Sequence, residues 1–219
     1  MSRTRVLVLT SLAMVAFAGN SLLCRAALKH SVIDPGTFTS IRMVAGAIAL
    51  WLIVSMRKRT QVRSGNWPSA LALFAYAAAF SFAYVDLSAG MGALLLFGAV
   101  QATMILFGLW KGERLNGWQG AGLAAALGGL VALVLPGLSA PPPGSATLMV
   151  IAGVAWGVYS LRGNGAGDPL ATTAGNFLRT VPFAAGLSLL LVSMARADFP
   201  GVAYAIVSGA LASGVGYAI

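Results

Sequence analysis

The amino-acid sequence predicts an all-α, polytopic bundle of transmembrane helices, and its composition is the first reason. Hydrophobic residues make up 58% of the 219 positions and charged residues only 9%, whereas a soluble domain carries roughly a quarter charged residues. The mean hydropathy is +0.86, so water alone could not solvate the surface and lipid is the expected solvent. The 27 glycines agree with this, because glycine lets membrane helices approach one another closely.

A series of long apolar segments is the second reason. A bilayer core requires about 20 apolar residues per helix. Turn-forming groups such as Asp34-Pro35-Gly36, Arg57-Lys58-Arg59 and Asp198-Phe199-Pro200 separate the segments of this chain. The expected spans are residues 6–28, 36–56, 68–88, 90–110, 116–136, 145–162, 171–194 and 200–219.

The first span has a second interpretation, as a signal peptide. Arg3 and Arg5 precede an apolar run that reaches Ala16-Phe17-Ala18, which is the pattern of a basic start followed by a small-residue cleavage site. The apolar run continues beyond this point through Leu22 and Leu23, and further spans follow it. We therefore predict an uncleaved first helix.

The positions of lysine and arginine predict the orientation, since cytoplasmic loops of membrane proteins are enriched in these residues. With a cytoplasmic N-terminus, the opposite side carries Arg25, Lys29 and Arg196, while Arg42 and Arg179 fall within spans. The cytoplasmic segments then hold Arg3, Arg5, Arg57, Lys58, Arg59, Arg63, Lys111, Arg114 and Arg162. This bias predicts an inner-membrane protein whose N-terminus lies in the cytoplasm.

Charge distribution and cysteine usage narrow the range of partners. The net charge of +9 is spread singly or in short clusters between apolar runs, and nucleic-acid binding would need a basic face interleaved with aromatic residues. We expect anionic lipid beside these charges instead, and no nucleic acid. The single cysteine, Cys24, excludes a disulfide within the chain and is expected to be a packing residue. No metal-ligand spacing is present, so the sequence predicts no metal and no cofactor.

The chain weakly repeats itself. The first copy contains Gly19, Asp34-Pro35, Arg42 and Tyr84, and the second repeats them as Gly157, Asp168-Pro169, Arg179 and Tyr217. The first copy is expected to contain five helices. Because five is odd, the second copy starts from the other side of the membrane. The expected units are a first five-helix repeat over residues 1–137, a proline-rich loop over 138–144, and a second repeat over 145–219.

Short motifs spread over most of the chain resemble those of the EamA-type drug/metabolite transporter superfamily. The motifs are Ala18-Gly19-Asn20-Ser21, Ser40-Ile41-Arg42, Gly112-Glu113-Arg114-Leu115, Gly120-Ala121-Gly122 through Gly128-Gly129, Ala155-Trp156-Gly157 and Leu178-Arg179. The resemblance implies a ten-helix exporter of amino acids or related metabolites, with a central cavity between inverted repeats. The second copy stops soon after Tyr217, about two helices early. We expect a C-terminally incomplete chain, with a natural eight-helix variant as the alternative.

Two arginines within spans are the first candidates for substrate binding. A charge at mid-helix costs about 2.5–3.5 kcal/mol on insertion scales, so Arg42 and Arg179 need a reason to be there. They could line a cationic cavity that binds a substrate carboxylate or phosphate. Alternatively, they reach the interface or cap carbonyl groups of neighbouring helices, and their matching positions favour a shared structural role.

Amide and aromatic side chains complete the expected substrate site. Asn20 and Asn176 lie within spans, where an amide either holds a substrate or bridges two helices. Tyr84, Trp156 and Tyr159 suit the wall of a metabolite cavity, although an interfacial belt or helix packing would use the same residues. No catalytic residue is expected, and the predicted substrate site is Asn20, Arg42, Tyr84, Trp156, Tyr159, Asn176 and Arg179.

Acidic residues offer only weak candidates for proton coupling. Asp86 lies at an expected helix end and Glu113 lies in a loop between basic residues, so both are expected to be solvated or paired. The residues themselves provide no chemical evidence for a driving ion.

Three classes of function remain open at this level. A transporter of small metabolites by alternating access, with the substrate and membrane lipid as partners, is the main prediction. A membrane-embedded protease would need a serine and a histidine in facing helices, and Ser208 and His30 are poorly placed for that. A non-catalytic membrane subunit or flippase accessory is the other alternative, and the oligomeric state, a homo-oligomer included, is undetermined.

Overall fold

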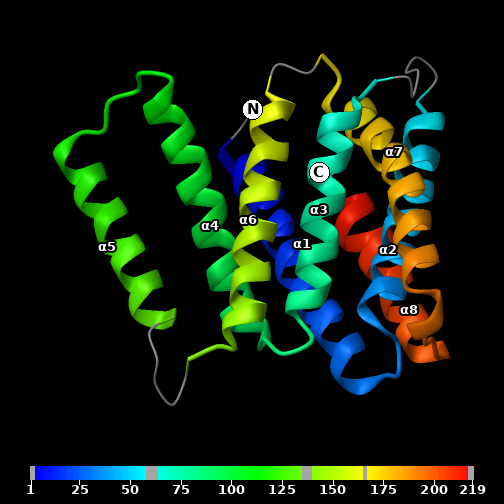
Figure 1. Cartoon of the computed structure of the whole chain (residues 1–219). Helices are drawn as coiled ribbons and strands as arrows, with labels where there is room; N and C mark the ends of the chain where they lie inside the picture. The colour runs from blue at the N-terminus through cyan, green and yellow to red at the C-terminus, as the bar shows by residue number, and fades with distance from the viewer. Residues whose placement is uncertain (1–2, 58–63, 135–139, 165–166, 217–219) are drawn as a thin grey trace.

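The computed structural model describes residues 3–57, 64–134, 140–164 and 167–216. Within these residues the chain forms α-helices with one short 3₁₀ turn, η1 (Val192–Met194), and one π-helical segment, η2 (Ser208–Val215), which confirms the all-α fold class. Figure 1 shows most of the helices side by side in one bundle, with the helix Gly117–Val134 standing apart at one edge. They are α1 (Arg3–His30), α2 (Pro35–Ser55), α3 (Trp67–Ala83), α4 (Ala89–Trp110), α5 (Gly117–Val134), α6 (Pro143–Gly163), α7 (Pro169–Leu190) and α8 (Phe199–Val207).

An Asp or Asn followed by proline starts many of these helices. Asp34 precedes α2 and accepts a hydrogen bond from the Thr37 backbone N–H, and Asn66 precedes α3 and accepts one from Ser69. Asp168 and Asp198 cap α7 and α8 in the same way. The cap satisfies a free N–H of the first turn, and proline at N1 or N2 has no N–H to satisfy. Local chemistry therefore decides where these helices begin.

The third helix is shorter than the sequence predicts. The expected span ran to residue 88, but α3 ends at Ala83. Ser88 then caps α4 by accepting a hydrogen bond from the Met91 N–H at 3.3 Å. The residues between these points form a turn, which carries Asp86 at the end of the bundle.

Many large apolar side chains of this bundle are exposed, and some polar groups are buried within a core that is otherwise apolar. Large apolar side chains such as Leu7, Val15 and Leu189 are exposed, whereas Arg42 and Asn176 are buried. By length and composition α1, α2, α4 and α6 can each cross a bilayer, and α3 and α8 are shorter apolar helices. Apolar surface outside and polar groups inside are what a lipid solvent requires.

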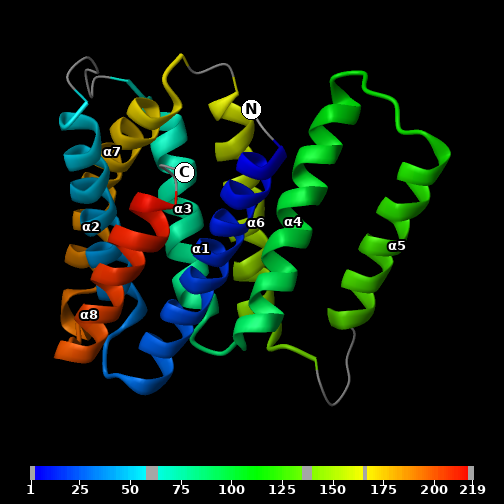
Figure 2. The same cartoon turned by 180° about the vertical axis from the view of Figure 1, so that it is seen from behind.

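The second group of helices is inverted relative to the first. Figures 1 and 2 show α1 starting at the end of the bundle where α6 finishes, so the two helices run in opposite directions. α2 packs against α7, α3 packs against α6 and α7, and α8 with η2 packs against α1 and α2. The pairs match between the two groups when each helix is replaced by the one five places away. The α3–α6 contact then corresponds to α8–α1, and the α3–α7 contact corresponds to α8–α2. Tyr217, the expected partner of Tyr84 in the repeat, lies outside the described residues.

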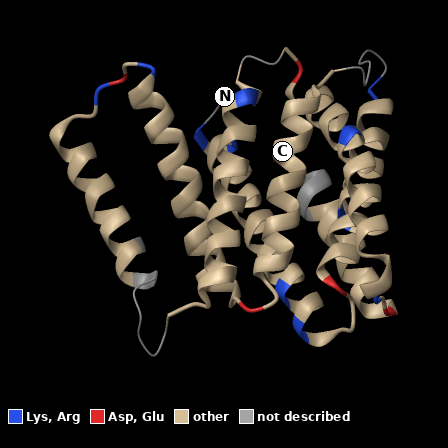
Figure 3. Cartoon of the chain, in the orientation of Figure 1, with Lys and Arg blue, Asp and Glu red and all other residues tan. Residues whose placement is uncertain are grey.

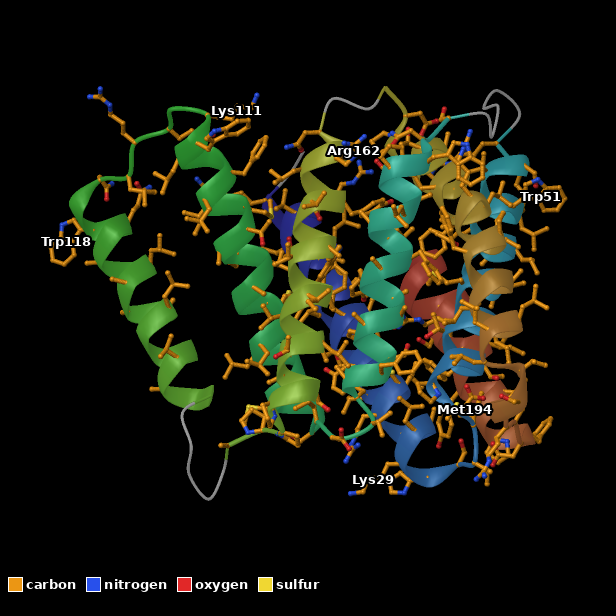
Figure 4. All side chains as sticks on the ribbon, viewed as in Figure 1. Lys29, Trp51, Lys111, Trp118, Arg162 and Met194 are labelled. Atoms are coloured by element: carbon orange, nitrogen blue, oxygen red, sulfur yellow. The ribbon has the colours of Figure 1, made fainter. Side chains whose placement is uncertain are left out.

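Most of the charged residues lie at or near the two ends of the helices (Figure 3). Lys111 and Arg162 lie at one end, and Lys29 and Met194 lie at the other (Figure 4). Helix α5 packs only weakly on the rest of the bundle, against α4. The remaining helices surround a buried polar centre.

Candidate functional site

The buried centre is built around Arg42 in α2. Its side chain is 0% exposed. One terminal nitrogen donates to the Ala77 carbonyl oxygen of α3 at 3.0 Å, and the other lies 3.5 Å from the Asn20 side-chain oxygen, a weak contact. The Nε atom is buried without a hydrogen-bond partner. Arg42 is thus a buried charge with spare donor capacity.

Aromatic rings surround the Arg42 guanidinium in place of carboxylates. The guanidinium carbon lies 5.0 Å from the ring centre of Phe80, 5.8 Å from that of Phe38 and 5.9 Å from that of Tyr76. Each ring attracts the cation electrostatically, by roughly 0.5–2 kcal/mol. These contacts offset part of the cost of burying the charge, without neutralising it.

Asn20 connects Arg42 to three other helices. From α1, its side-chain nitrogen donates to the Tyr76 hydroxyl at 3.2 Å. Its side-chain oxygen accepts a hydrogen bond from the Ser208 hydroxyl at 2.8 Å. Ser208 is the first residue of η2, and π-helical segments occur frequently at functional sites. The polar centre therefore includes groups from both units.

An aromatic cluster extends from Tyr76 toward α4 and α6. Trp156 of α6 stacks on Tyr76 with the ring centres 5.5 Å apart. Phe17 meets the same indole edge-on at 5.2 Å, and Phe97 lies 5.7 Å from it. These rings form an apolar surface beside the Arg42 and Asn20 polar groups.

Tyr84 joins this centre through Phe80. Its ring meets that of Phe80 edge-on at 4.7 Å, and its hydroxyl donates to the Ala89 carbonyl oxygen at 3.2 Å. The structure thus brings four of the predicted residues together in one connected region. They are Asn20, Arg42, Tyr84 and Trp156.

Tyr159, Asn176 and Arg179 lie elsewhere, at the start of α3. The Asn176 side-chain oxygen accepts a hydrogen bond from the Asn66 backbone N–H at 2.9 Å. Arg179 donates to the Ser64 carbonyl oxygen at 2.9 Å, and Tyr159 interacts with the Asn176 side chain. These residues hold the α2–α3 connection against α7. Arg42 and Arg179 match in the repeat but make different contacts.

Sequence reasoning missed Tyr76 and Ser208. Tyr76 had a usable signal, because Tyr76, Phe80 and Tyr84 are each four residues apart and so share one helix face. Ser208 had none, since its partner Asn20 is 188 positions away. The contact of Ser208 with Asn20 also argues against the protease alternative. His30 lies roughly 15 Å further along α1 than Asn20 at the α-helical rise, on an exposed end, so it is far from the Ser208 hydroxyl.

Inverted units of membrane helices around a buried polar centre are found in many secondary transporters. The model of the EamA-like transporter family matches residues 4–135. The chain belongs to this family, as its motifs indicated, and is a membrane transporter.

Two further comparisons agree with this assignment. An uncharacterized protein of Pseudomonas aeruginosa, PA1977, is 58% identical over 216 residues, which cover 98% of this chain and 75% of the relative. A protein of known crystal structure superimposes with a TM-score of 0.66 at 17% identity, covering 99% of this chain and 78% of that one. At this identity the second likeness concerns the fold alone.

Proposed function

We propose that this chain carries small metabolites such as amino acids out of the cell, and that it works by alternating access. In this mechanism the two inverted units rock against each other and expose the centre first to one side and then to the other. The observation that carries the proposal is the buried Arg42, which has an unpartnered Nε and lies where helices of both units meet.

Arg42 is the proposed partner of an anionic group on the substrate. A guanidinium binds a carboxylate or phosphate through two parallel hydrogen bonds, which are stronger than bonds between neutral groups. The Asn20 amide and the Ser208 hydroxyl would bind the remaining polar atoms. Trp156 and Tyr84 would face the apolar part of the substrate, because aromatic walls suit a metabolite cavity.

Tyr159, Asn176 and Arg179 form a second, peripheral part of the proposed pathway. In this conformation Asn176 and Arg179 form hydrogen bonds with residues just before α3, and Tyr159 interacts with Asn176. A substrate would meet them once that end of the bundle opens. Their proposed role is therefore to close one entrance and to guide the substrate, while Arg42 binds it.

The proposed orientation has the N-terminus in the cytoplasm. Lys111 and Arg162 lie at the end of the bundle where α1 begins (Figures 1 and 4), and basic residues are expected to be enriched on the cytoplasmic side. Labelling of single cysteines with a membrane-impermeant reagent in whole cells tests it. A cysteine replacing Lys29 should react, and one replacing Arg162 should not. The reverse result would overturn the orientation.

Transport by the purified chain in vesicles tests the proposed function. We expect uptake of radiolabelled amino acids by the wild type and by Lys29→Gln, a control on an exposed surface. Arg42→Gln should lose at least about a hundredfold in transport, the size of effect expected for a binding group. Amino-acid amides, which lack the carboxylate, should compete poorly.

Helical circular dichroism and a single elution peak would establish that the variants are folded. Full transport by a folded Arg42→Gln variant would show that Arg42 does not bind the substrate. Failure of the wild type to transport any of a broad metabolite panel would contradict the function itself.

A further inference from the structure

The two units touch at both ends of the bundle, and the hydrogen bonds at the two ends differ in chemistry. We call the end where α1 meets α2 and α7 meets α8 the carboxylate end, and the end where α3 begins the amide end. Lys29 and Met194 mark the first and Arg162 marks the second (Figure 4). In an alternating-access protein, such contacts hold an entrance closed.

At the carboxylate end, Asp34 and Asp198 exchange hydrogen bonds across the two units. Asp34 accepts the Thr37 N–H at 2.9 Å on one oxygen and the Arg196 N–H at 2.8 Å on the other. Asp198 accepts the Gly201 N–H on one oxygen and the Val32 N–H on the other, both at 3.1 Å. Each carboxylate therefore caps its own helix and also holds the opposite unit.

Asp86 makes a third contact of the same kind. It lies in the α3–α4 turn and accepts the hydroxyl of Ser145, the residue near the start of α6, at 2.5 Å. A hydrogen bond to an ionised carboxylate is about twice as strong as one between neutral groups. Three contacts between the units thus depend on negative charge at this end.

The amide end uses acceptors that do not ionise. The Asn176 side-chain oxygen accepts the Asn66 N–H at 2.9 Å. Arg179 donates to the Ser64 carbonyl oxygen at 2.9 Å, and Arg162 donates to the Ser69 hydroxyl at 3.2 Å. Arginine remains protonated throughout the physiological range, and amides and hydroxyls do not titrate there. Asp168 is also near this end, but it accepts hydrogen bonds from Leu170 and Ala171 of its own helix α7.

We propose that acid weakens the carboxylate end selectively, so that protonation favours opening there while the amide end stays closed. This inference rests on the proposed alternating-access function and adds a control by protons to it. Protonation turns one of the two carboxylate oxygens into an O–H group, so Asp34 and Asp198 can no longer accept two N–H groups each. The Ser145 hydroxyl can still bond the neutral Asp86 carboxyl group, but all three contacts lose their charge-assisted strength.

Protons can reach these groups, and the neighbouring charges act in the same direction. Asp34 lines a cavity of about 420 Å³ together with Arg196. The other ionisable groups at this end are Arg25, Lys29 and His30, and Arg25 donates to the Tyr84 carbonyl oxygen at 2.8 Å beside the Asp86 turn. Arg25, Lys29 and Arg196 are basic side chains. Neutralising the carboxylates leaves them to repel one another.

The pKa of Asp34 is consistent with a closing role. Partial burial alone would raise the pKa of this carboxyl group, but hydrogen bonds from the Arg196 and Thr37 backbone hold it below its ordinary value. The closed end gains stability above the ordinary aspartate pKa and loses it as the pH falls through the lower, folded value.

Hydrogen–deuterium exchange tests the proposal, because the Arg196 and Val32 N–H groups are themselves the donors. The full chain in lipid nanodiscs is compared at about pH 7 and about pH 3, which is below the ordinary aspartate pKa, with rates corrected for intrinsic exchange. Protection of residues 31–34 and 195–198 should fall by at least about tenfold in acid relative to that of residues 64–66. Equal loss at both ends, or no loss, would overturn the proposal.

Variants separate this effect from unfolding and from His30. The double variant Asp34→Asn and Asp198→Asn mimics the protonated form and should expose residues 31–34 and 195–198 at neutral pH. Asp168→Asn is the matched control, since it also caps a helix before a proline, and it should change neither end. His30→Gln should keep the acid response, and its loss there would assign the response to the histidine instead.

The outcome is distinguishable from that of the proposed function. Exchange reports opening whether or not a substrate moves. Transport by a chain whose two ends respond equally to acid would leave the function in place and remove this inference. Selective opening by a chain that transports nothing would support this inference and contradict the proposed function.

Discussion

Arg42 and Arg179 hold matching places in two related units, yet their surroundings differ. Arg42 is fully buried among three aromatic rings, and its Nε has no partner. Arg179 is half-buried and donates to the carbonyl oxygens of Ser64 and Gly175 at 2.9 and 2.8 Å. Arg42 thus has a donor at the centre of the bundle that is free to bind a substrate. Arg179 donates to backbone carbonyl groups, and we propose that these bonds help to close one end.

The comparison teaches that a sequence repeat does not by itself repeat an environment. Because the two units run in opposite directions through the bundle, the two arginines contact different parts of the chain around α3. Arg42 reaches the Ala77 carbonyl oxygen within the helix, and Arg179 reaches the residue stretch before it. Function can therefore divide between the copies, with binding in one and closure in the other. The following predictions test that division.

The largest effect is expected at the aromatic wall of the centre. Trp156→Ala removes a buried side chain that contacts rings from three helices and should lower the free energy of unfolding by about 3–5 kcal/mol. Denaturation in mixed micelles measures this. Trp118→Ala is the control, because Trp118 is 90% exposed. Similar losses for the two variants would mean that the Trp156 cluster is not a packed centre.

Arg42→Met and Arg179→Met compare the two arginines directly. Burying a charge is costly, and no ion pair of Arg42 is seen among the described residues, so an apolar side chain of similar volume should be tolerated at this position. Arg42→Met should therefore fold at least as stably as the wild type, yet lose about a hundredfold in transport. Vesicle transport and thermal unfolding of the same samples measure both quantities. A stable variant with normal transport would contradict the binding role.

Arg179→Met should show the opposite pattern. It removes two hydrogen bonds from a charged donor and should cost about 1–2 kcal/mol in stability. Hydrogen exchange should increase at residues 64–66, because Arg179 holds Ser64. Transport should decline by less than about tenfold. A loss of transport as large as that of Arg42→Met would join both arginines in one binding site.

The smallest effect concerns pH and Asp34. Because hydrogen bonds depress the pKa of Asp34, the contribution of this group to stability is present above its ordinary pKa and is lost as the pH falls through the lower, folded pKa. The loss should stay below about 1 kcal/mol, since the group is largely solvated. Thermal unfolding of the wild type and Asp34→Asn as a function of pH measures it. The variant should lack this acid-dependent component.

Much of the fold follows from short-range features of the sequence. The apolar composition requires lipid, and Asp34-Pro35 and Asp168-Pro169 start helices because a cap and a proline act within one turn. The odd number of helices before the second copy predicts its inversion, whichever side chains meet later. The predicted candidates Asn20, Arg42 and Trp156 were found because polar or aromatic groups are unusual within apolar spans.

Only the tertiary structure decided which of these groups meet. Ser208 contacts Asn20 across 188 positions, and Asn176 contacts Asn66 across 110. Such pairs depend on how all the helices pack, and no local pattern carries that information. Composition and turn chemistry act over a few residues and so determined the helices and their directions. The buried environment of Arg42 and the bonds of Arg179 at one end of the bundle arise from long-range packing. Such packing depends on all the helices together and cannot be read from any short segment of the sequence.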